Sequence, residues 1–368
     1  MNKIKTFQLF ETYGEQYQPY IPPVIEALKQ NKMLDVSVVA FNKSSTTADI
    51  IIPSYRERRF KEKLYALTNR SKLNYLEIIS LKQKVDIIHI QQSYMFSKVY
   101  NILQLPKENR PKIVITLRGG DTYVKPWYIK KWQDFYTHYG KLIDAFVVMS
   151  IHQKEYLHTK WKIPLNNIHV IPISFGEAFP VSEKKTETTI LKVVSAYRMC
   201  WEKNIEGNLR VVKLLKEQQI PVQYEIYGGG ADTGQVYYLI DKYNLSDCVT
   251  YFGSVRNKEL KKRLIANDFY LQLSHSESLG MSVIEAQAQG LPAVVSNSDG
   301  LPEVVLDAKT GFCVSPNDIA SAASHLIYLW KHPKIYKEFS KEAILYSHKN
   351  FNINKEVKSL KGLYCSLL

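Results

Sequence analysis

Two glutamates around a glycine-containing loop form the strongest candidate site in the sequence. Glu277 and Glu285 have seven residues between them, and Gly280 lies within that interval. The pattern predicts a strand that ends near Leu273, a loop that carries Glu277, and a helix that carries Glu285. A helix N-terminus with free N–H groups suits a diphosphate or sugar oxygens, and carboxylates accept hydrogen bonds from vicinal hydroxyls. The alternative interpretation is two solvated glutamates around a turn.

Two cations follow an earlier β-branched run, residues 191–196. Arg198 and Lys203 lie where a loop leads into an amphipathic stretch, Asn204 to Glu217. Cations five residues apart on such a loop can converge on a diphosphate and neutralise its charge as it leaves. Taken alone, the pair is read more simply as two surface cations of a basic chain.

These blocks together resemble the retaining glycosyltransferases, most closely glycosyltransferase family four. The two glutamates match the E-x7-E signature of that family, and the two cations match its R-x4-K block. Residues 294–305 and 310–312 are similar to the next two blocks. The resemblance covers most of residues 190–315 and is fainter over 1–180. It implies a GT-B fold, with the donor nucleotide on the second of two Rossmann-like domains and the acceptor on the first.

The resemblance also implies a role for each matched residue. Glu285 would bind the ribose hydroxyls of the donor, while Arg198 and Lys203 would stabilise the departing diphosphate. Glu277 would orient the donor sugar. The other donor-site residues that it implies are Ser278, Leu279, Gly280, Met281, Gly228, Gly253 and Ser254.

The glycine run 228–230 also resembles a dinucleotide fingerprint, but the match is incomplete. A G-x-G-x-x-G pattern requires glycine where Thr233 stands, and no acidic residue ends the following strand, residues 249–252. An NAD-dependent oxidoreductase is therefore the weaker interpretation.

In the first half, a glycine-containing segment follows the expected strand 112–116. The family usually has His-Gly there, whereas this sequence has Arg118, so the role of the histidine is not transferred; arginine can hold a sugar oxygen or an acceptor phosphate. His89 is as readily a structural histidine as a substrate contact. The candidate acceptor or cleft residues are Gly14, Glu15, Arg118, Gly119 and Asp121.

Strand-like runs alternate with helical segments along the whole chain, which predicts parallel, doubly wound sheets. We expect an acceptor-binding Rossmann-like domain over 1–183 and a donor-binding one over 184–345. A C-terminal helix within 346–368 is expected to pack back toward the first domain. The polar stretch 181–189 is the expected linker.

Composition excludes several classes. The 368 residues are 45% hydrophobic and 23% charged, as in packed proteins. Four scattered cysteines favour a reducing compartment, and no apolar run reaches the ~20 residues that span a bilayer, so we expect a cytoplasmic protein, peripheral on the inner face of a membrane at most. There is no D-x-D motif, so we expect no metal and no cofactor.

The positive charge is uneven, with 26 basic against 15 acidic residues over 1–180 and 23 against 20 over 181–368. Residues 56–72 carry many of these cations, and Phe60, Leu64 and Leu67 recur there at i, i+4 and i+7. We expect an anionic membrane surface as a partner, and no nucleic acid. The alternative is an outer helix whose Phe60 face packs on its own sheet.

The sequence as a whole predicts a retaining, metal-independent glycosyltransferase. It would move a sugar from a UDP- or GDP-linked donor to a glycan or lipid-linked acceptor, in polysaccharide or glycolipid synthesis. A catalytically silent nucleotide-sugar-binding partner in a polysaccharide assembly complex is the alternative, because Arg118 replaces the usual histidine.

Overall fold

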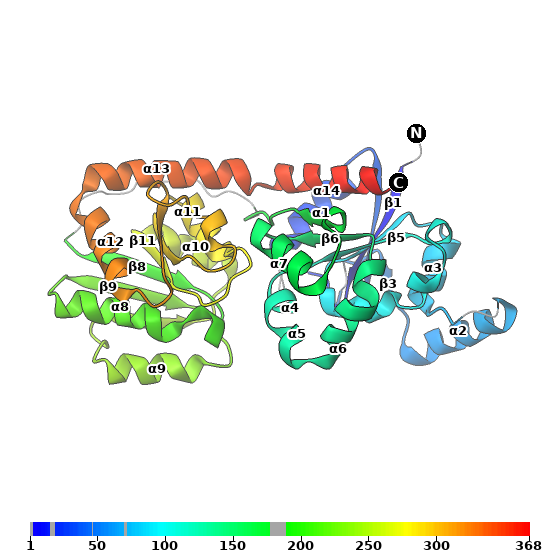
Figure 1. Cartoon of the computed structure of the whole chain (residues 1–368), viewed down its shortest axis with the longest axis horizontal. Coiled ribbons are helices and arrows are strands. Elements are labelled where there is room, and N and C mark those ends of the chain that lie inside the picture. Colours follow the sequence, from blue (N-terminus) through cyan, green and yellow to red (C-terminus); the bar gives the residue numbers. More distant parts are fainter. Residues whose placement is uncertain (1–2, 15–18, 46, 70–71, 177–188) are drawn as a thin grey trace. The chain divides into compact units, whose positions relative to one another are not determined.

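The computed structural model describes residues 3–14, 19–45, 47–69, 72–176 and 189–368. The chain divides into two compact units, which are residues 1–176 with 353–368 and residues 177–352. Each unit is built on one parallel sheet with helices around it (Figure 1). The predicted class, two doubly wound α/β domains, is therefore confirmed. The expected linker 181–189 lies almost entirely outside the described residues.

The sheet of the first unit has the order β3-β2-β1-β4-β5-β6-β7, and all its strand pairs are parallel. Its strands are β1 Ile4–Phe10, β2 Leu34–Ala40, β3 Ile50–Ile51, β4 Ile87–Ile90, β5 Lys112–Thr116, β6 Ala145–Val148 and β7 Ile168–Val170. Its helices are α1 Ile21–Lys29, α2 Tyr55–Asn69, α3 Tyr75–Lys82, α4 Gly120–Tyr123, α5 Lys125–Tyr128, α6 Lys130–Asp134, α7 Ile151–Trp161 and α14 Ile353–Leu367. The short strands β3 and β7 were not predicted from the sequence.

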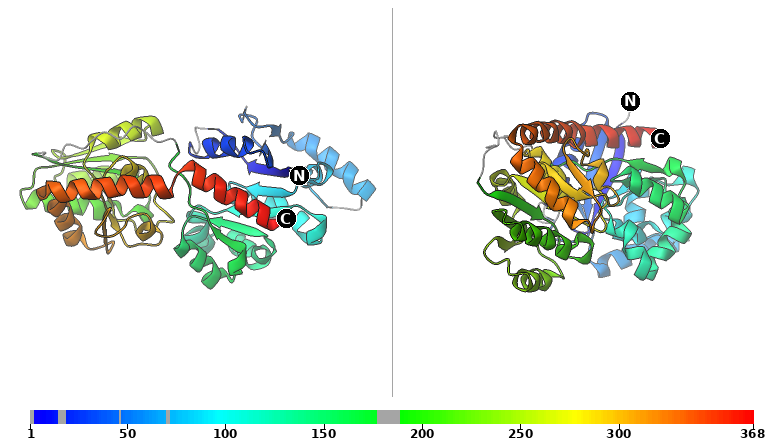
Figure 2. Two further views of the ribbon diagram at one scale, coloured as in Figure 1. Left: turned by 90° about the horizontal axis from the view of Figure 1, so that it is seen from above. Right: turned by 60° about the vertical axis from the view of Figure 1, so that its left-hand side comes forward.

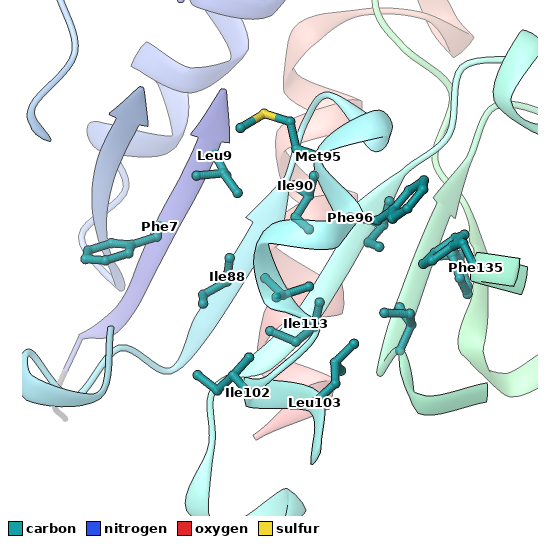
Figure 3. Close-up of a cluster of buried hydrophobic side chains, with 14 of the residues drawn as sticks. Phe7, Leu9, Ile88, Ile90, Met95, Phe96, Ile102, Leu103, Ile113 and Phe135 are labelled. Atoms are coloured by element: carbon teal, nitrogen blue, oxygen red, sulfur yellow. The ribbon is translucent and has the colours of Figure 1, made fainter. Parts of the chain in front are cut away.

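Apolar strands covered on both faces account for this sheet, because a parallel sheet buries both of its faces. Phe7, Ile88 and Ile113 come from β1, β4 and β5 and are fully buried in one cluster. Phe96 and Phe135 stack in the same cluster with ring centroids 4.3 Å apart (Figure 3).

The second sheet repeats the arrangement with the order β10-β9-β8-β11-β12-β13, again entirely parallel. Its strands are β8 Leu191–Ala196, β9 Val222–Tyr227, β10 Val249–Gly253, β11 Phe269–Gln272, β12 Ala293–Ser296 and β13 Gly311–Val314. Its helices are α8 Ile205–Glu217, α9 Thr233–Lys242, α10 Asn257–Ala266, α11 Met281–Ala288, α12 Ile319–Lys331 and α13 Pro333–Asn350. Every strand expected from residues 191–296 is present.

The last helix, α14, belongs to the first unit, although α13 directly before it belongs to the second. It packs along α1 (Figures 1 and 2). The Tyr364 hydroxyl accepts a hydrogen bond from the Gln8 amide at 3.1 Å, and the Glu356 carboxylate accepts one from the Ser174 N–H at 2.7 Å. These contacts complete the fold of the first unit with residues from the end of the chain. Among the described residues, no helix is long and apolar enough to cross a bilayer.

Candidate active site

Three loops meet at the carboxyl edge of the second sheet. They follow β8, β11 and β12, which are neighbours in the sheet, and the strand order reverses between β8 and β11. Ligands of doubly wound sheets bind at such a reversal. Backbone hydrogen bonds join the loops: the His275 N–H donates to the Glu202 carbonyl at 2.7 Å, and the Gly300 N–H donates to the Glu277 carbonyl at 2.9 Å. The site is therefore one connected surface made from distant segments.

Lys203 and Glu277 form an ion pair at the centre of this edge. Lys203 ends the short 3₁₀ turn after β8, and Glu277 lies in the loop after β11. Their side chains are only 10% and 15% exposed. The Gln272 amide donates a second hydrogen bond to the same carboxylate at 3.0 Å. Because little water reaches this pair, its charges act more strongly than surface charges would.

Asp299 holds the loop that carries Glu277, and the sequence did not single it out. Its carboxylate accepts hydrogen bonds from the Ser276 hydroxyl at 2.7 Å and from the Glu277 N–H at 3.0 Å. Its backbone has φ +47°, an uncommon conformation for a residue other than glycine. The sequence feature that could have indicated Asp299 is its place directly before Gly300, in the segment that follows β12.

The loop then turns into α11 at Gly280. Gly280 has φ +93°, which glycine adopts readily, and a Cβ there would lie 2.7 Å from the Leu301 side chain. Ser278 and Leu279 are buried beside it, and Met281 begins the helix. No side chain caps α11, so its first N–H groups point out of the helix end as donors with a partial positive charge.

Glu285 lies on α11 and is only 7% exposed. The Asn257 amide of α10 donates a hydrogen bond to its carboxylate at 2.8 Å. Burial raises the pKa of Glu285, while Asn257 and the ammonium of Lys261 act against that rise. One carboxylate has about four acceptor positions, so Glu285 keeps capacity for further donors. Asn257 and Lys261 were not predicted, and the only sequence feature that could have indicated them is their place just after the donor candidates Gly253 and Ser254.

The remaining donor candidates lie at the ends of β9 and β10, at the same edge. Gly228 has φ +119°, and a Cβ on it would lie 1.9 Å from the Tyr197 carbonyl oxygen, so only glycine fits. Its N–H donates to the Gly253 carbonyl at 2.8 Å. Ser254 and Arg198 are exposed, and Arg198 forms no ion pair with any residue that the structure describes. Of the two predicted cations, Lys203 is therefore paired and Arg198 faces solvent.

The candidates of the first unit form a separate group of contacts. The Arg118 guanidinium donates to the carbonyl and the side-chain oxygen of Gln91, the latter at 2.9 Å. Asp121 is 6% exposed, and its carboxylate accepts from the N–H groups of Gly119 at 2.9 Å and Arg118 at 3.2 Å. Asp121 therefore holds the loop after β5, and Arg118 reaches toward the loop after β4.

His89 is a structural residue in this unit. Its two ring nitrogens lie 2.7 Å from the Tyr364 hydroxyl and 2.7 Å from the Thr116 hydroxyl. Burial, together with the nearby charge of Arg118, lowers the pKa of His89 to about 3, so the ring is neutral. Gly14 has φ +147° and lines a small pocket after β1, while Glu15 lies outside the described residues.

No group of three or more His, Cys, Asp or Glu side chains among the described residues is placed to hold a metal ion. The polar groups at the edge of the second sheet instead include the cations Arg198 and Lys203, the carboxylates Glu277 and Glu285, and the N–H groups at the uncapped start of α11. Such a set suits a ligand with both phosphate oxygens and hydroxyl groups.

Comparison with protein families gives two matches. Residues 177–345 match the model described as Glycosyl transferases group 1, and residues 24–173 match the model described as Glycosyltransferase Family 4. Trehalose synthase of Pyrococcus horikoshii is 26% identical over 260 residues, which are 64% of this chain and 61% of the relative. Alpha-monoglucosyldiacylglycerol synthase of Acholeplasma laidlawii is 30% identical over 146 residues, which are 40% and 36%. The matched part thus spans less than two thirds of each relative.

A solved structure is similar over the whole chain. HepE of Anabaena, in complex with UDP and glucose, superposes with a TM-score of 0.73 at 13% identity, covering 99% of this chain and 100% of that one. At this identity the likeness shows the fold, which is GT-B. Residues 24–173 are thus similar to a Glycosyltransferase Family 4 domain and residues 177–345 to a Glycosyl transferases group 1 domain, and the chain has the GT-B fold.

Proposed function

We propose that this chain is a retaining glycosyltransferase that needs no metal or cofactor and uses a nucleotide diphosphate sugar as donor. One observation carries the proposal: the Lys203–Glu277 pair and the Asn257-bound Glu285 lie at the strand-order reversal of the group 1 domain. Charges for a diphosphate and acceptors for hydroxyl groups thus occur on one edge. The bound UDP and glucose of the Anabaena neighbour support a nucleotide-sugar donor.

Each side chain has a distinct task in donor binding. The unused acceptor positions of Glu285 bind the ribose hydroxyls, because two neighbouring hydroxyl groups can both donate hydrogen bonds to one carboxylate. The diphosphate is bound by Lys203 and by Arg198, which is exposed and has no ion-pair partner among the described residues. Glu277 fixes the Lys203 ammonium and orients the donor sugar together with the backbone of 278–281.

The reaction exchanges one bond to the anomeric carbon for another. The bond between that carbon and the β-phosphate oxygen breaks, and a bond to the acceptor hydroxyl oxygen forms on the same face. The hydroxyl proton passes to the departing phosphate, so no other base is required. Negative charge grows on the diphosphate as it leaves, and contacts with Arg198 and Lys203 therefore lower the barrier more than they tighten substrate binding.

We propose a glycan or lipid-linked acceptor, bound by the first domain at an anionic membrane surface on the cytoplasmic side. Gly14 lies in the loop after β1, Arg118 and Gly119 lie in the loop after β5, and Asp121 lies in α4 directly behind that loop, so all four are at the carboxyl edge of the first sheet. The excess of basic residues over 1–180 supports an anionic acceptor or surface. A role in polysaccharide or glycolipid synthesis is supported by the Acholeplasma laidlawii relative, whose name describes the synthesis of a glucosyl lipid.

Ligand-induced stabilisation tests the donor site, because a ligand of the native state raises the melting temperature. The wild type should be stabilised by UDP or GDP and less by ADP. Glu285→Gln should lower nucleotide affinity at least roughly tenfold, since it removes a charged acceptor. Glu225→Gln is the matched control, because Glu225 also accepts from an asparagine amide, that of Asn267 at 2.9 Å, and lies within β9 of the same unit.

Acceptor-dependent release of free nucleotide diphosphate then separates an enzyme from a silent binding partner. Stabilisation by nucleotide without any such release, across a panel of glycan and glycolipid acceptors, would favour the silent partner. Unchanged nucleotide affinity in Glu285→Gln would remove the donor-site assignment itself.

A further inference from the structure

Helix α2 presents a row of large apolar side chains to solvent. Phe60, Leu64 and Leu67 are 71%, 56% and 81% exposed. Their spacing of four and three residues places them on one face of the helix. An exposed stripe of this kind is uncommon on monomeric proteins and marks a surface that another phase or molecule covers.

The opposite face of α2 is the one that packs on the protein. Tyr65 is half-buried against the core of the first unit, and the Glu62 carboxylate accepts a hydrogen bond from the Tyr75 N–H, at the start of α3, at 2.9 Å. Figure 1 shows α2 beside α3 at the outer edge of this unit. The structure thus rejects the interpretation that the Phe60 face packs on its own sheet.

Cations border the apolar stripe. Arg56, Arg59 and Lys63 are exposed and recur at i, i+3 and i+7, so they form a basic row along one flank of the stripe. On the other flank, Lys61 is paired with Glu57 at 2.9 Å. The helix carries five cations against two carboxylates, which leaves a net positive surface around the apolar row. Lys72, just beyond the helix, is also exposed, and Arg70 lies outside the described residues.

We propose that α2 is an interfacial membrane-binding helix that lies flat in the surface of an anionic bilayer. Phe60, Leu64 and Leu67 enter the acyl-chain boundary, while the row Arg56, Arg59 and Lys63 contacts lipid phosphates. A bilayer is the occupant that fits, because apolar residues beside a flanking row of Lys and Arg are typical of helices in this position. The Tyr65 and Glu62 contacts hold the helix so that the stripe faces outward. This attachment needs no sugar transfer, so it is tested without donor or acceptor.

Co-sedimentation of the full chain with vesicles tests the proposal. With vesicles of phosphatidylcholine and phosphatidylglycerol at low salt, the wild type should pellet, and with phosphatidylcholine alone it should bind far more weakly. The triple change Phe60→Ser, Leu64→Ser and Leu67→Ser should lower partitioning at least about 100-fold. Its matched control is Tyr237→Ser with Tyr238→Ser, two residues on α9 that are 61% and 62% exposed, and it should bind as the wild type does.

Charge reversal tests the basic row separately. Arg56→Glu, Arg59→Glu and Lys63→Glu together should lower partitioning at least about 100-fold, and wild-type binding should weaken as salt rises. The matched control reverses three exposed lysines on one face of α13 and should keep full binding. Those control residues are Lys334, Lys337 and Lys341.

A depth measurement separates insertion from simple surface attraction. The tryptophan fluorescence added by Leu64→Trp should be quenched by brominated lipids in the bound state, whereas that added by Tyr237→Trp should not be. All variants should keep the wild-type melting temperature, because the altered side chains are solvent-exposed.

Three results would overturn the proposal. They are a wild type that stays in the supernatant at low salt, full binding by the serine variant, or added fluorescence in the Leu64→Trp variant that brominated lipids do not quench. A dimer in solution that the serine changes dissociate, without vesicle binding, would assign the stripe to a second copy of the chain instead.

Discussion

Removing the ammonium of Lys203 is the sharpest test of the proposed chemistry. In the structure this group lies against Glu277, with both side chains at most 15% exposed. In the proposed reaction, Lys203→Ala removes one preorganised positive charge from the site of the departing diphosphate. Loss of such a contact costs about 3–4 kcal/mol in the transition state, which is roughly a 100–1,000-fold fall in kcat/KM.

The same change also affects folding, and the two effects must be separated. Without Lys203, Glu277 keeps the Gln272 amide but loses its counter-charge, so we expect a stability loss of roughly 1–3 kcal/mol. Lys203→Met combined with Glu277→Gln should recover most of that loss, because it leaves no unpaired charge. It should not recover activity, because the cation that binds the diphosphate is still missing.

The assay is kcat/KM for nucleotide release with donor and acceptor, alongside chemical denaturation of each variant. Lys216→Ala is the matched control, since Lys216 forms a 2.7 Å ion pair with Asp247 on the surface of the same unit. An exposed pair contributes about 0–1 kcal/mol, so this variant should keep full activity. Near-normal turnover by Lys203→Ala would refute the assignment, and so would activity that returns with stability in the double variant.

Four further predictions follow from the site and the fold. Sugar transfer should persist in EDTA, since in the proposed reaction Lys203 and Arg198 supply the charge that a metal would provide; a loss that magnesium or manganese restores would show a metal requirement. Proton NMR of the product should show the donor's anomeric configuration, and an inverted product would exclude the same-face reaction. Burial raises the pKa of Glu356 from 4.5 to about 7, so the folded state holds this proton more tightly than the unfolded state, and the free energy of unfolding falls as pH rises from about 4.5 to 7. Denaturation curves at pH 8 should show Glu356→Gln roughly 2–3 kcal/mol more stable than the wild type, with little difference at pH 4.5. Equal stability of the two proteins at pH 8 would contradict the pKa shift. Gly228→Ala should destabilise the second unit by roughly 3 kcal/mol or more in a thermal melt, because the new Cβ would lie 1.9 Å from the Tyr197 carbonyl oxygen. Gly234 has open space around it, so Gly234→Ala should be neutral or stabilising in the same experiment.

The sequence by itself predicted the elements that position the site. The short β-branched run 191–196 became a largely buried parallel strand, because such a run is stable inside a sheet covered on both faces, and the strand-like run 222–227 became its neighbour β9. Gly280, between the two glutamates, proved to mark the turn into α11 with its positive φ. The spacing of Glu277 and Glu285 correctly assigned the first to a loop and the second to a helix.

Only the tertiary structure decided which polar groups are partners. Lys203 and Glu277 are 74 residues apart in the chain and meet because β8 and β11 are adjacent in the sheet. His89 was open between a structural and a substrate role until its ring was found between Thr116 and Tyr364, the latter from the last helix. The direction of the Phe60 stripe on α2 was open as well. Side-chain periodicity determines which residues share a face, but strand order and helix docking determine what that face meets.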